Sequence, residues 1–442
     1  MPYPLRYLSK IVPLSCISFF LLFLMASPAY ALTVSETDVD TTHILEDMIV
    51  DSSGNIHSVL IAGVGGGASY NLVYKKYDGS SWSATTIDTG AEGVSYHASI
   101  DLDSSNKPGI AWVEWNDTAN TQSLFYRKYT GSTWGDDSNT VLVESGMDDT
   151  SGKPSLKFYK ESDDLNYPTI FTCQGSTYVV EEHKAQGSTN EPTFSAPTSI
   201  SNNAAHDCSS VDARISTTDT RFVVTSPKGP TNGTAYSHVN TGSGWTAADV
   251  FTGVDVQNGS EIFLDDDGTN YHAVMIDDLA GSGTDKILYN VFSSGSWDAF
   301  ETLTSGAHIG EAYIDVVADT DQDIPYVLYF ENASTTAPLK FMYKSSGSWT
   351  TGNIDTSGFT LGTQGEDYFN FVAGDYYSGG SKLMVLSTMY LSSGPPFFDL
   401  NKYELTDLPT SGGGGVPEFS TYVYIILLTT LFGLLYKKSR IT

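Results

Sequence analysis

Short runs in which apolar and polar positions alternate recur along the chain, and clusters of Ser, Asn, Asp, Gly and Pro separate them. Four such runs lie at 97–102, 109–115, 123–129 and 139–143. Alternation with a period of two is typical of half-buried strands, whereas a helix needs apolar residues three and four positions apart. We therefore predict an antiparallel four-stranded sheet in this stretch.

This four-run unit repeats, and a hairpin turn that ends in tryptophan marks its copies. The marking residues are Trp82, Trp134, Trp245, Trp297 and Trp349. Three of the steps are 52 residues long, and the longer step after Trp134 leaves room for one more copy, in which Phe194 takes the aromatic place. Four strands in a period near 50 are typical of a β-propeller. We interpret the tryptophans as scaffold between blades, with stacking on sugar rings as the alternative.

Seven first strands can be placed, which predicts seven blades. They lie at 44–50, 97–102, 154–159, 209–215, 260–264, 312–317 and 367–372. The last copy lacks a fourth strand, while residues 32–38 (LTVSETD) resemble the fourth strands of other copies. We expect this N-terminal strand to complete the last blade and close the ring. The expected fold is an all-β seven-bladed propeller over 32–407.

The two ends of the chain predict export and anchoring. Basic residues, an apolar run and a small-x-small site identify 1–31 as a signal peptide that is cleaved. A Gly-rich linker at 408–415 leads to the apolar segment 419–436, which a basic cluster follows. That order predicts a C-terminal transmembrane helix with the propeller outside the cell.

A short motif precedes the apolar segment: Val416, Pro417, Glu418 and Phe419. The order of motif, apolar helix and basic cluster over 416–440 resembles the sorting tails of the PEP-CTERM and PEF-CTERM type. The resemblance implies a sorting transpeptidase of the exosortase or archaeosortase type as partner, and a cut near Pro417. A plain membrane anchor is the alternative.

Charge and cysteine content narrow the class of protein. The chain has 22 Lys and Arg against 52 Asp and Glu, a formal net charge of −30. Such a field repels nucleic acid and suits divalent cations, Ca²⁺ among them, or high salt. Cys173 and Cys208 are the cysteines left after the signal peptide, and they predict a disulfide between the third and fourth blades, with two buried thiols as the alternative.

Acidic residues recur at comparable places on the predicted first strands. They are Asp47, Asp212, Glu261, Asp315 and Asp367. Ser99 and Ser155 take this place in blades two and three. Carboxylates gathered near the axis would bind a cation or a polar ligand. The alternative, which we favour, is that each carboxylate accepts a backbone N–H from the neighbouring blade.

Histidines and acidic turns give weaker signals. His97 and His308, together with His43 and His206, fall at or just before first strands, so that they could gather at one face as a metal or ligand site. Solvated loop histidines are the alternative. The acidic turns between first and second strands resemble calcium loops but lack a closing Glu, and tight turns favour the same residue types.

The strands, the D-x-x-G-x-x-H turns and the G-S-x-W hairpins resemble the BNR-repeat, sialidase-like propeller superfamily over 32–405. The Asp-box of that family is degenerate here, since 78–82 lacks one spacer residue. Sialidase activity would need three arginines on separate blades, and the only candidates are Arg127, Arg214 and Arg221, two of them in one blade. The resemblance therefore implies the fold and disfavours sialidase activity.

These observations favour a non-catalytic binding or adhesion module for glycans or surface proteins. A glycoside hydrolase or lyase that uses the first-strand carboxylates is the second hypothesis, since it needs only two carboxylates at a suitable distance. A structural surface-layer protein bridged by cations is the third.

Overall fold

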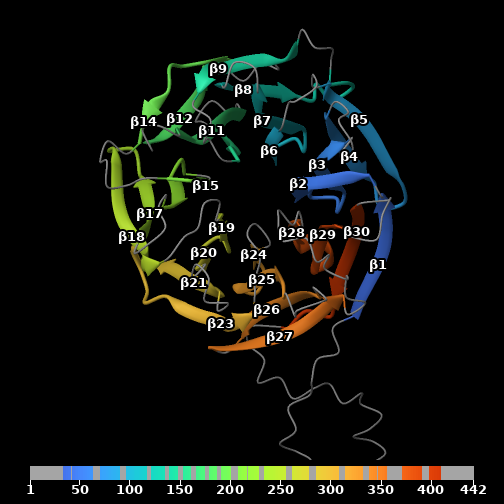
Figure 1. Cartoon of the computed structure of the whole chain (residues 1–442), viewed down its shortest axis with the longest axis vertical. Helices are drawn as coiled ribbons and strands as arrows, with labels where there is room; N and C mark the ends of the chain where they lie inside the picture. The colour runs from blue at the N-terminus through green and yellow to red at the C-terminus, as the bar shows by residue number, and fades with distance from the viewer. Residues whose placement is uncertain are drawn as a thin grey trace, which may run out of the picture. The chain divides into compact units, whose positions relative to one another are not determined.

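Each repeat predicted from the sequence forms one antiparallel sheet. A computed structural model of the chain describes residues 33–40, 42–62, 70–89, 96–116, 121–134, 139–147, 153–160, 166–174, 179–186, 191–200, 208–216, 218–227, 233–254, 261–277, 285–307, 314–331, 338–345, 347–355, 371–390 and 398–409. Within these residues the strands form seven sheets, which we number as blades 1 to 7 in chain order. The predicted seven-bladed propeller is confirmed (Figure 1).

Four of the blades contain four strands that are consecutive in the chain. Blade 1 consists of β2 (His43–Val50), β3 (Ile56–Ala62), β4 (Asn71–Tyr77) and β5 (Trp82–Thr89). Blade 2 consists of β6 (Tyr96–Leu102), β7 (Pro108–Asn116), β8 (Thr121–Lys128) and β9 (Val141–Met147). Blade 4 consists of β15 (Ser210–Ile215), β16 (Arg221–Ser226), β17 (Gly233–Asn240) and β18 (Trp245–Val254). Blade 6 consists of β24 (Ile314–Asp319), β25 (Ile324–Phe330), β26 (Leu339–Ser345) and β27 (Ser348–Asp355).

In two blades the outer strand is divided. Blade 3 consists of β10 (Ser155–Lys160), β11 (Asn166–Gln174), β12 (Val179–Gln186) and the two-residue pieces β13 (Thr193–Phe194) and β14 (Thr198–Ser199). Blade 5 consists of β19 (Ile262–Asp266), β20 (Tyr271–Asp277), β21 (Asp285–Ser293), β22 (Ser296–Trp297) and β23 (Glu301–Ala307). Blade 3 therefore has the shortest outer edge.

The ring closes through the N-terminal strand, as predicted. Blade 7 consists of β28 (Phe371–Tyr377), the short 3-10 turn η2 (Ser378–Gly380), β29 (Lys382–Tyr390), β30 (Phe398–Thr406) and β1 (Thr33–Asp40). β1 pairs antiparallel with β30 from Thr33 opposite Thr406 to Asp40 opposite Leu400, with one irregularity after Asp38. The first and last parts of the propeller thus share one sheet, and in Figure 1 the blue β1 lies beside the red β30.

Hydrophobic cores lie between blades, because each sheet has two apolar faces. Every core cluster contains residues of two adjacent blades; one joins Ile44 and Val59 of blade 1 to Trp112 of blade 2, and another joins Leu45 of blade 1 to Leu386 of blade 7. The middle strands are the most buried, and all seven residues of β25 are buried. A single blade would leave these faces in water, so the blades stabilise one another.

The repeated tryptophans take part in this packing. Trp134 of blade 2 lies edge-on to Tyr74 of blade 1, with ring centroids 4.9 Å apart. Trp349 lies 4.8 Å from Tyr289 of the preceding blade in the same manner. In blade 3, whose repeat has no tryptophan at this place, Phe194 packs on a tyrosine of blade 2, Tyr126. In these three blades the aromatic of the repeat thus contacts the blade before it, which is the scaffold role.

Blades 3 and 4 are also linked covalently. A disulfide joins Cys173 of β11 to Cys208, which lies just before β15, and their Cα atoms are 5.8 Å apart. The predicted signal peptide, Gly-rich linker, sorting motif and transmembrane helix lie outside the described residues. Where the structure is described, we find no helix that is both long and apolar enough to cross a membrane.

Candidate functional site

The innermost strands surround the axis of the propeller (Figure 1). Their side chains join each blade to the next. In the repeated arrangement, an oxygen of an inner-strand aspartate or serine accepts a backbone N–H of the following inner strand. The links are Asp47 to Ile100, Asp101 to Phe158, Ser155 to Ala213, Asp212 to Leu264, Asp265 to Ala318, Asp315 to Gly374 and Asp375 to Val50. Donor and acceptor are 2.6–3.1 Å apart.

Both oxygens of several of these carboxylates are used. Asp47 Oδ1 accepts the N–H of Met48 at 3.0 Å, while its Oδ2 accepts the N–H of Ile100 at 3.0 Å. Asp212, Asp315 and Asp375 repeat this pattern with the next residue on one oxygen and the next blade on the other. A carboxylate held in this way has a fixed orientation, and the N–H groups offset part of the cost of burying its charge.

The structure places the five acidic residues that we predicted from the sequence in different ways. Asp47, Asp212 and Asp315 lie at the axis, and each accepts a backbone N–H of the next blade. This is the alternative that we favour from the sequence. Glu261 lines the same central cavity, just before β19. Asp367 lies outside the described residues, and Asp375 takes its place in the ring.

The predicted histidines do not gather into a described site. His97 begins blade 2 with half of its side chain exposed, 3.9 Å from Glu46 Oε2. His308 and His206 lie outside the described residues, as do most of the loops that the sequence places at this face. His43, the first residue of β2, pairs at 2.9 Å with Asp40, the last residue of β1.

A central cavity of 310 Å³ lies on the axis, and residues of all seven inner strands or of the segments just before them line it. Its lining contains eight carboxylates: Glu46, Asp47, Asp101, Asp212, Glu261, Asp265, Asp315 and Asp375. It also contains three cations, Lys153, Lys157 and Arg214. The volume is at the lower end of the range for small-molecule sites, about 300–1,000 Å³.

The three cations of the lining lie close to its carboxylates. Lys153 reaches past blade 2 to donate to the carbonyl of Glu46 at 2.7 Å, and it lies 3.6 Å from Asp47. Arg214 binds Asp265 of the next blade through two nitrogens, each 2.9 Å from the same oxygen. Lys157 lies 4.0 Å from Asp212. The cations of the described lining thus come from blades 3 and 4, and each lies near a carboxylate of another blade.

Burial and these neighbours separate the pKa values of the carboxylates. Burial raises the pKa of Glu46 to about 8 and that of Asp375 to about 7. Burial opposes the charge of Asp212 as well, but Lys157 and Arg214 outweigh it and lower the pKa of that carboxyl. At neutral pH the cavity thus contains protonated and ionised carboxyls together.

The arginines do not assemble the triad that sialidase activity would need. Arg127 is buried and donates to the carbonyls of Trp134 and Ile87 between blades 1 and 2. Arg221 pairs with Glu182 and Asp219 beside blade 3, and only Arg214 of the three lines the central cavity. Among the described residues, the three arginines therefore do not meet in one site, as we expect from the sequence.

The repeated acidic turns are structural. Asp51 accepts the N–H groups of Ser53 and Asn55, and its other oxygen lies 3.3 Å from His57 Nε2. His57 Nδ1 in turn lies 2.7 Å from the hydroxyl of Tyr74. In blade 5 Asp267, His272 and Tyr289 repeat this chain of contacts. The D-x-x-G-x-x-H pattern therefore holds a turn against strands of its own blade.

Sequence reasoning missed Glu46, Asp101, Asp265, Asp375 and the three cations. A signal exists, because side chains two apart on an inner strand face the axis together. Ser99 and Asp101 are such a pair, and both accept N–H groups from blade 3. If both positions that face the axis are considered on every inner strand, Asp101 and Asp265 become candidates from the sequence.

Comparison with known proteins gives distant likenesses in fold. No protein-family model and no curated protein matches the chain. Among solved structures, phage phi92 endosialidase matches 85% of this chain and 69% of its own at 11% identity, with a TM-score of 0.49. Polysaccharide lyase Uly1 matches 84% and 98% at 8% identity (TM-score 0.48). NanB sialidase from Streptococcus pneumoniae matches 86% and 71% at 12% identity (TM-score 0.44).

Proposed function

We propose that this propeller is a non-catalytic module that binds a glycan at its central cavity. The observation that carries the proposal is that Asp47, Asp212, Asp315 and Asp375 each have both carboxylate oxygens on backbone N–H groups. Such a carboxylate is oriented by the scaffold and poorly suited to act as a nucleophile, because attack would break these bonds.

The lining favours a neutral polyhydroxy ligand. Carboxylates and the cations Lys153, Lys157 and Arg214 offer acceptors and donors around one small space, and hydroxyl groups can bind both. An anionic sugar would meet eight carboxylates and only three cations, so a neutral glycan fits the charge better.

A glycan array with the purified protein, with and without Ca²⁺, tests the proposal. We expect binding to neutral glycans, weakened about tenfold or more by Glu261→Gln and by Lys153→Met, since each removes one charged hydrogen-bonding group from the wall. Asp78→Asn in the exposed hairpin turn is the matched control and should bind normally. A blank array in both states, or binding that neither cavity variant weakens, would refute the proposal.

A glycoside hydrolase or lyase is the second candidate. Burial keeps the pKa of Glu46 at about 8, so this carboxyl is protonated at neutral pH, while neighbouring cations keep Asp212 ionised. Two carboxyls whose pKa values are pushed apart are typical of acid and base pairs. Turnover of an array ligand by the wild type, and its loss in Glu46→Gln, would favour this candidate.

We also propose that the protein is exported and held at the cell surface by its C-terminal tail, where a sorting transpeptidase processes it. The signal sequence and the order of motif, apolar segment and basic cluster over 416–440 support this. Mass spectrometry of the protein isolated from its own cells should find a chain that begins at Leu32 and ends near Pro417. An intact C-terminus would refute processing and leave a plain anchor.

A further inference from the structure

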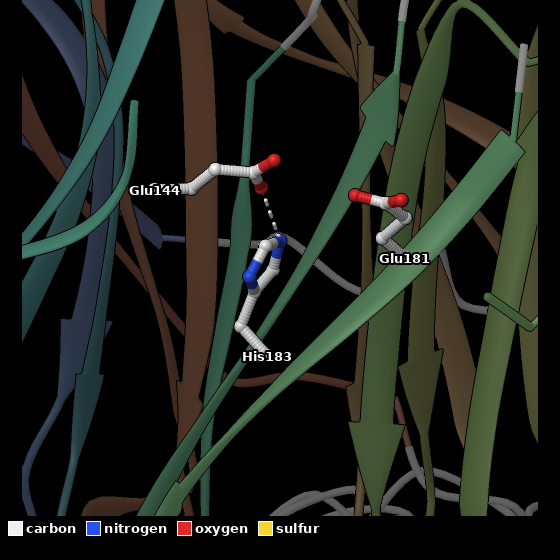
Figure 2. Close-up of side chains that lie close together, drawn as sticks. All are labelled: Glu144, Glu181 and His183. Atoms are coloured by element: carbon white, nitrogen blue, oxygen red, sulfur yellow. Dashed lines mark ion pairs between the residues drawn. The ribbon is translucent and has the colours of Figure 1, made fainter. Parts of the chain in front are cut away.

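Three ionisable side chains meet between blades 2 and 3, far from the inner strands. Glu144 is on β9, the outer strand of blade 2, whereas Glu181 and His183 are on β12 of blade 3. Because Glu181 and His183 are two residues apart on a strand, they project from the same face of the sheet. Figure 2 shows the Glu144 carboxylate facing a ring nitrogen of His183, with the Glu181 carboxylate near the same end of the ring. One ligand atom from each residue lies within 4.8 Å of the other two.

His183 is fully buried at the centre of this cluster. Its Nδ1 has no hydrogen-bond partner among the described residues, and its Nε2 lies 3.1 Å from the hydroxyl of Thr172. Histidine binds metals through a ring nitrogen without a proton, and Nε2 is the nitrogen that lies beside Glu144.

The distance between His183 and Glu144 also fits two ligands of one metal ion. His183 Nε2 and Glu144 Oε2 are 3.4 Å apart, longer than a good N–H···O hydrogen bond of about 2.7–3.2 Å. Two ligands at about 2.1 Å from a tetrahedral Zn²⁺ are themselves about 3.4 Å apart. A carboxylate oxygen of Glu181 lies within 4.8 Å of these two atoms and offers the third ligand.

We propose that Glu144, Glu181 and His183 form a binding site for a divalent transition metal of the Zn²⁺ type. One imidazole nitrogen and two carboxylate oxygens suit Zn²⁺, whereas Ca²⁺ and Mg²⁺ prefer ligand sets made of oxygen alone. Water would complete the coordination. The bound ion would also neutralise two carboxylates that lie beside a buried neutral ring.

The position of the site gives it a structural role. The outer strand of blade 3 is reduced to β13 and β14, with two residues each, so this blade has little outer edge to hold it. On one side the disulfide Cys173–Cys208 ties blade 3 to blade 4. The metal would tie its other side to blade 2, because Glu144 comes from β9 and the other two ligands from β12.

To test the site, any bound metal is first removed from the full-length protein with a chelator, and metal binding is then measured. We expect Zn²⁺ to bind with one high-affinity equivalent in calorimetry and to raise the melting temperature by several degrees, while Ca²⁺ at equal concentration does neither at this site. Co²⁺ should give the visible d–d bands of a tetrahedral complex with imidazole and carboxylate ligands.

Glu144→Gln and Glu181→Gln keep the size of each side chain and should each weaken Zn²⁺ binding about a hundredfold or more. Two matched controls should keep it: Glu182→Gln, whose side chain pairs with Arg221, and Thr172→Val, which removes only the competing hydroxyl. Absence of a Zn²⁺ equivalent would overturn the proposal, as would an equivalent that survives the Glu144→Gln/Glu181→Gln double variant. Neither outcome depends on glycan binding.

Discussion

Asp375 of the last blade accepts the backbone N–H of Val50 in the first blade, with 2.6 Å between Oδ2 and N. This bond is the seventh of the ring on the inner strands, and it lies at the junction that β1 closes at the outer edge. The chain is therefore closed twice between blades 7 and 1, once by a side chain at the axis and once by a backbone ladder at the rim. Because the side-chain bond and the backbone ladder involve different residues, we expect that a mutation can weaken one and leave the other in place.

The first prediction concerns pH. Burial raises the pKa of Asp375 to about 7 and of Glu46 to about 8, above the values of unfolded carboxyls. The folded protein then binds more protons than the unfolded chain, so this contribution to stability is present at low pH and is lost as pH rises through the folded pKa. We expect the melting temperature to rise by a few degrees from pH 8.5 to pH 6.5.

Asp375→Asn provides the control for this pH effect, because it does not titrate. Its amide oxygen can still accept the N–H of Val50, whereas the bond from Tyr376 N–H is lost, so the shapes of the pH profiles are compared and not the absolute melting temperatures. The variant should show a flatter pH profile between 6.5 and 8.5. Below pH 6.5 buried histidines such as His57 and His183, whose pKa values burial lowers, oppose the trend. An equally steep profile in Asp375→Asn would assign the pH dependence to other groups.

The second prediction concerns closure at the rim. Deletion of Thr33–Asp40 removes the ladder with β30 and the ion pair between Asp40 and Lys75, and exposes an unpaired strand edge. We expect the melting temperature to fall by about 10 °C or more. Adding a synthetic peptide of residues 33–40 should restore part of the loss, whereas a scrambled peptide should not. An unchanged melting temperature would reject closure by β1.

Much of the fold could be predicted because it repeats in the sequence. The tryptophan hairpins reveal the period, the seven first strands give the blade count, and the missing fourth strand of the last blade identifies β1 as its partner. The site was harder to predict, since each inner strand has two axial positions and the acid can occupy either, as Ser99 and Asp101 illustrate. Glu144 and His183 are 39 positions apart on different blades, and only the packing of one blade on the next brings them together.

The third prediction concerns the disulfide. Cys173 and Cys208 are separated by 35 residues, and a cross-link that closes a loop of this length stabilises a fold by about 3–4 kcal/mol on the chain-entropy estimate. The Cys173→Ala/Cys208→Ala variant should therefore melt several degrees lower than the oxidised protein. A reductant should lower the melting temperature of the wild type and leave that of the double variant unchanged. If reductant moves both equally, the effect does not come from this bond.

The fourth prediction concerns the junction of blades 6 and 7, where Gly374 lets two inner strands approach. Its N–H donates to Asp315, and a Cβ at this position would lie 2.5 Å from Leu328 Cδ1 and 2.9 Å from Val317 Cγ2. Gly374→Ala should cost about 1–3 kcal/mol in unfolding free energy, because an extra methyl must displace packed side chains.

Leu328→Val shortens the side chain that lies nearest, so the same Gly374→Ala change should cost less in that background. A double-mutant cycle by denaturant unfolding measures the difference, which should be favourable by about 0.5 kcal/mol or more. Additive effects would mean that Leu328 is not what excludes the methyl group, and would shift the explanation to Val317 or to the hydrogen bond with Asp315.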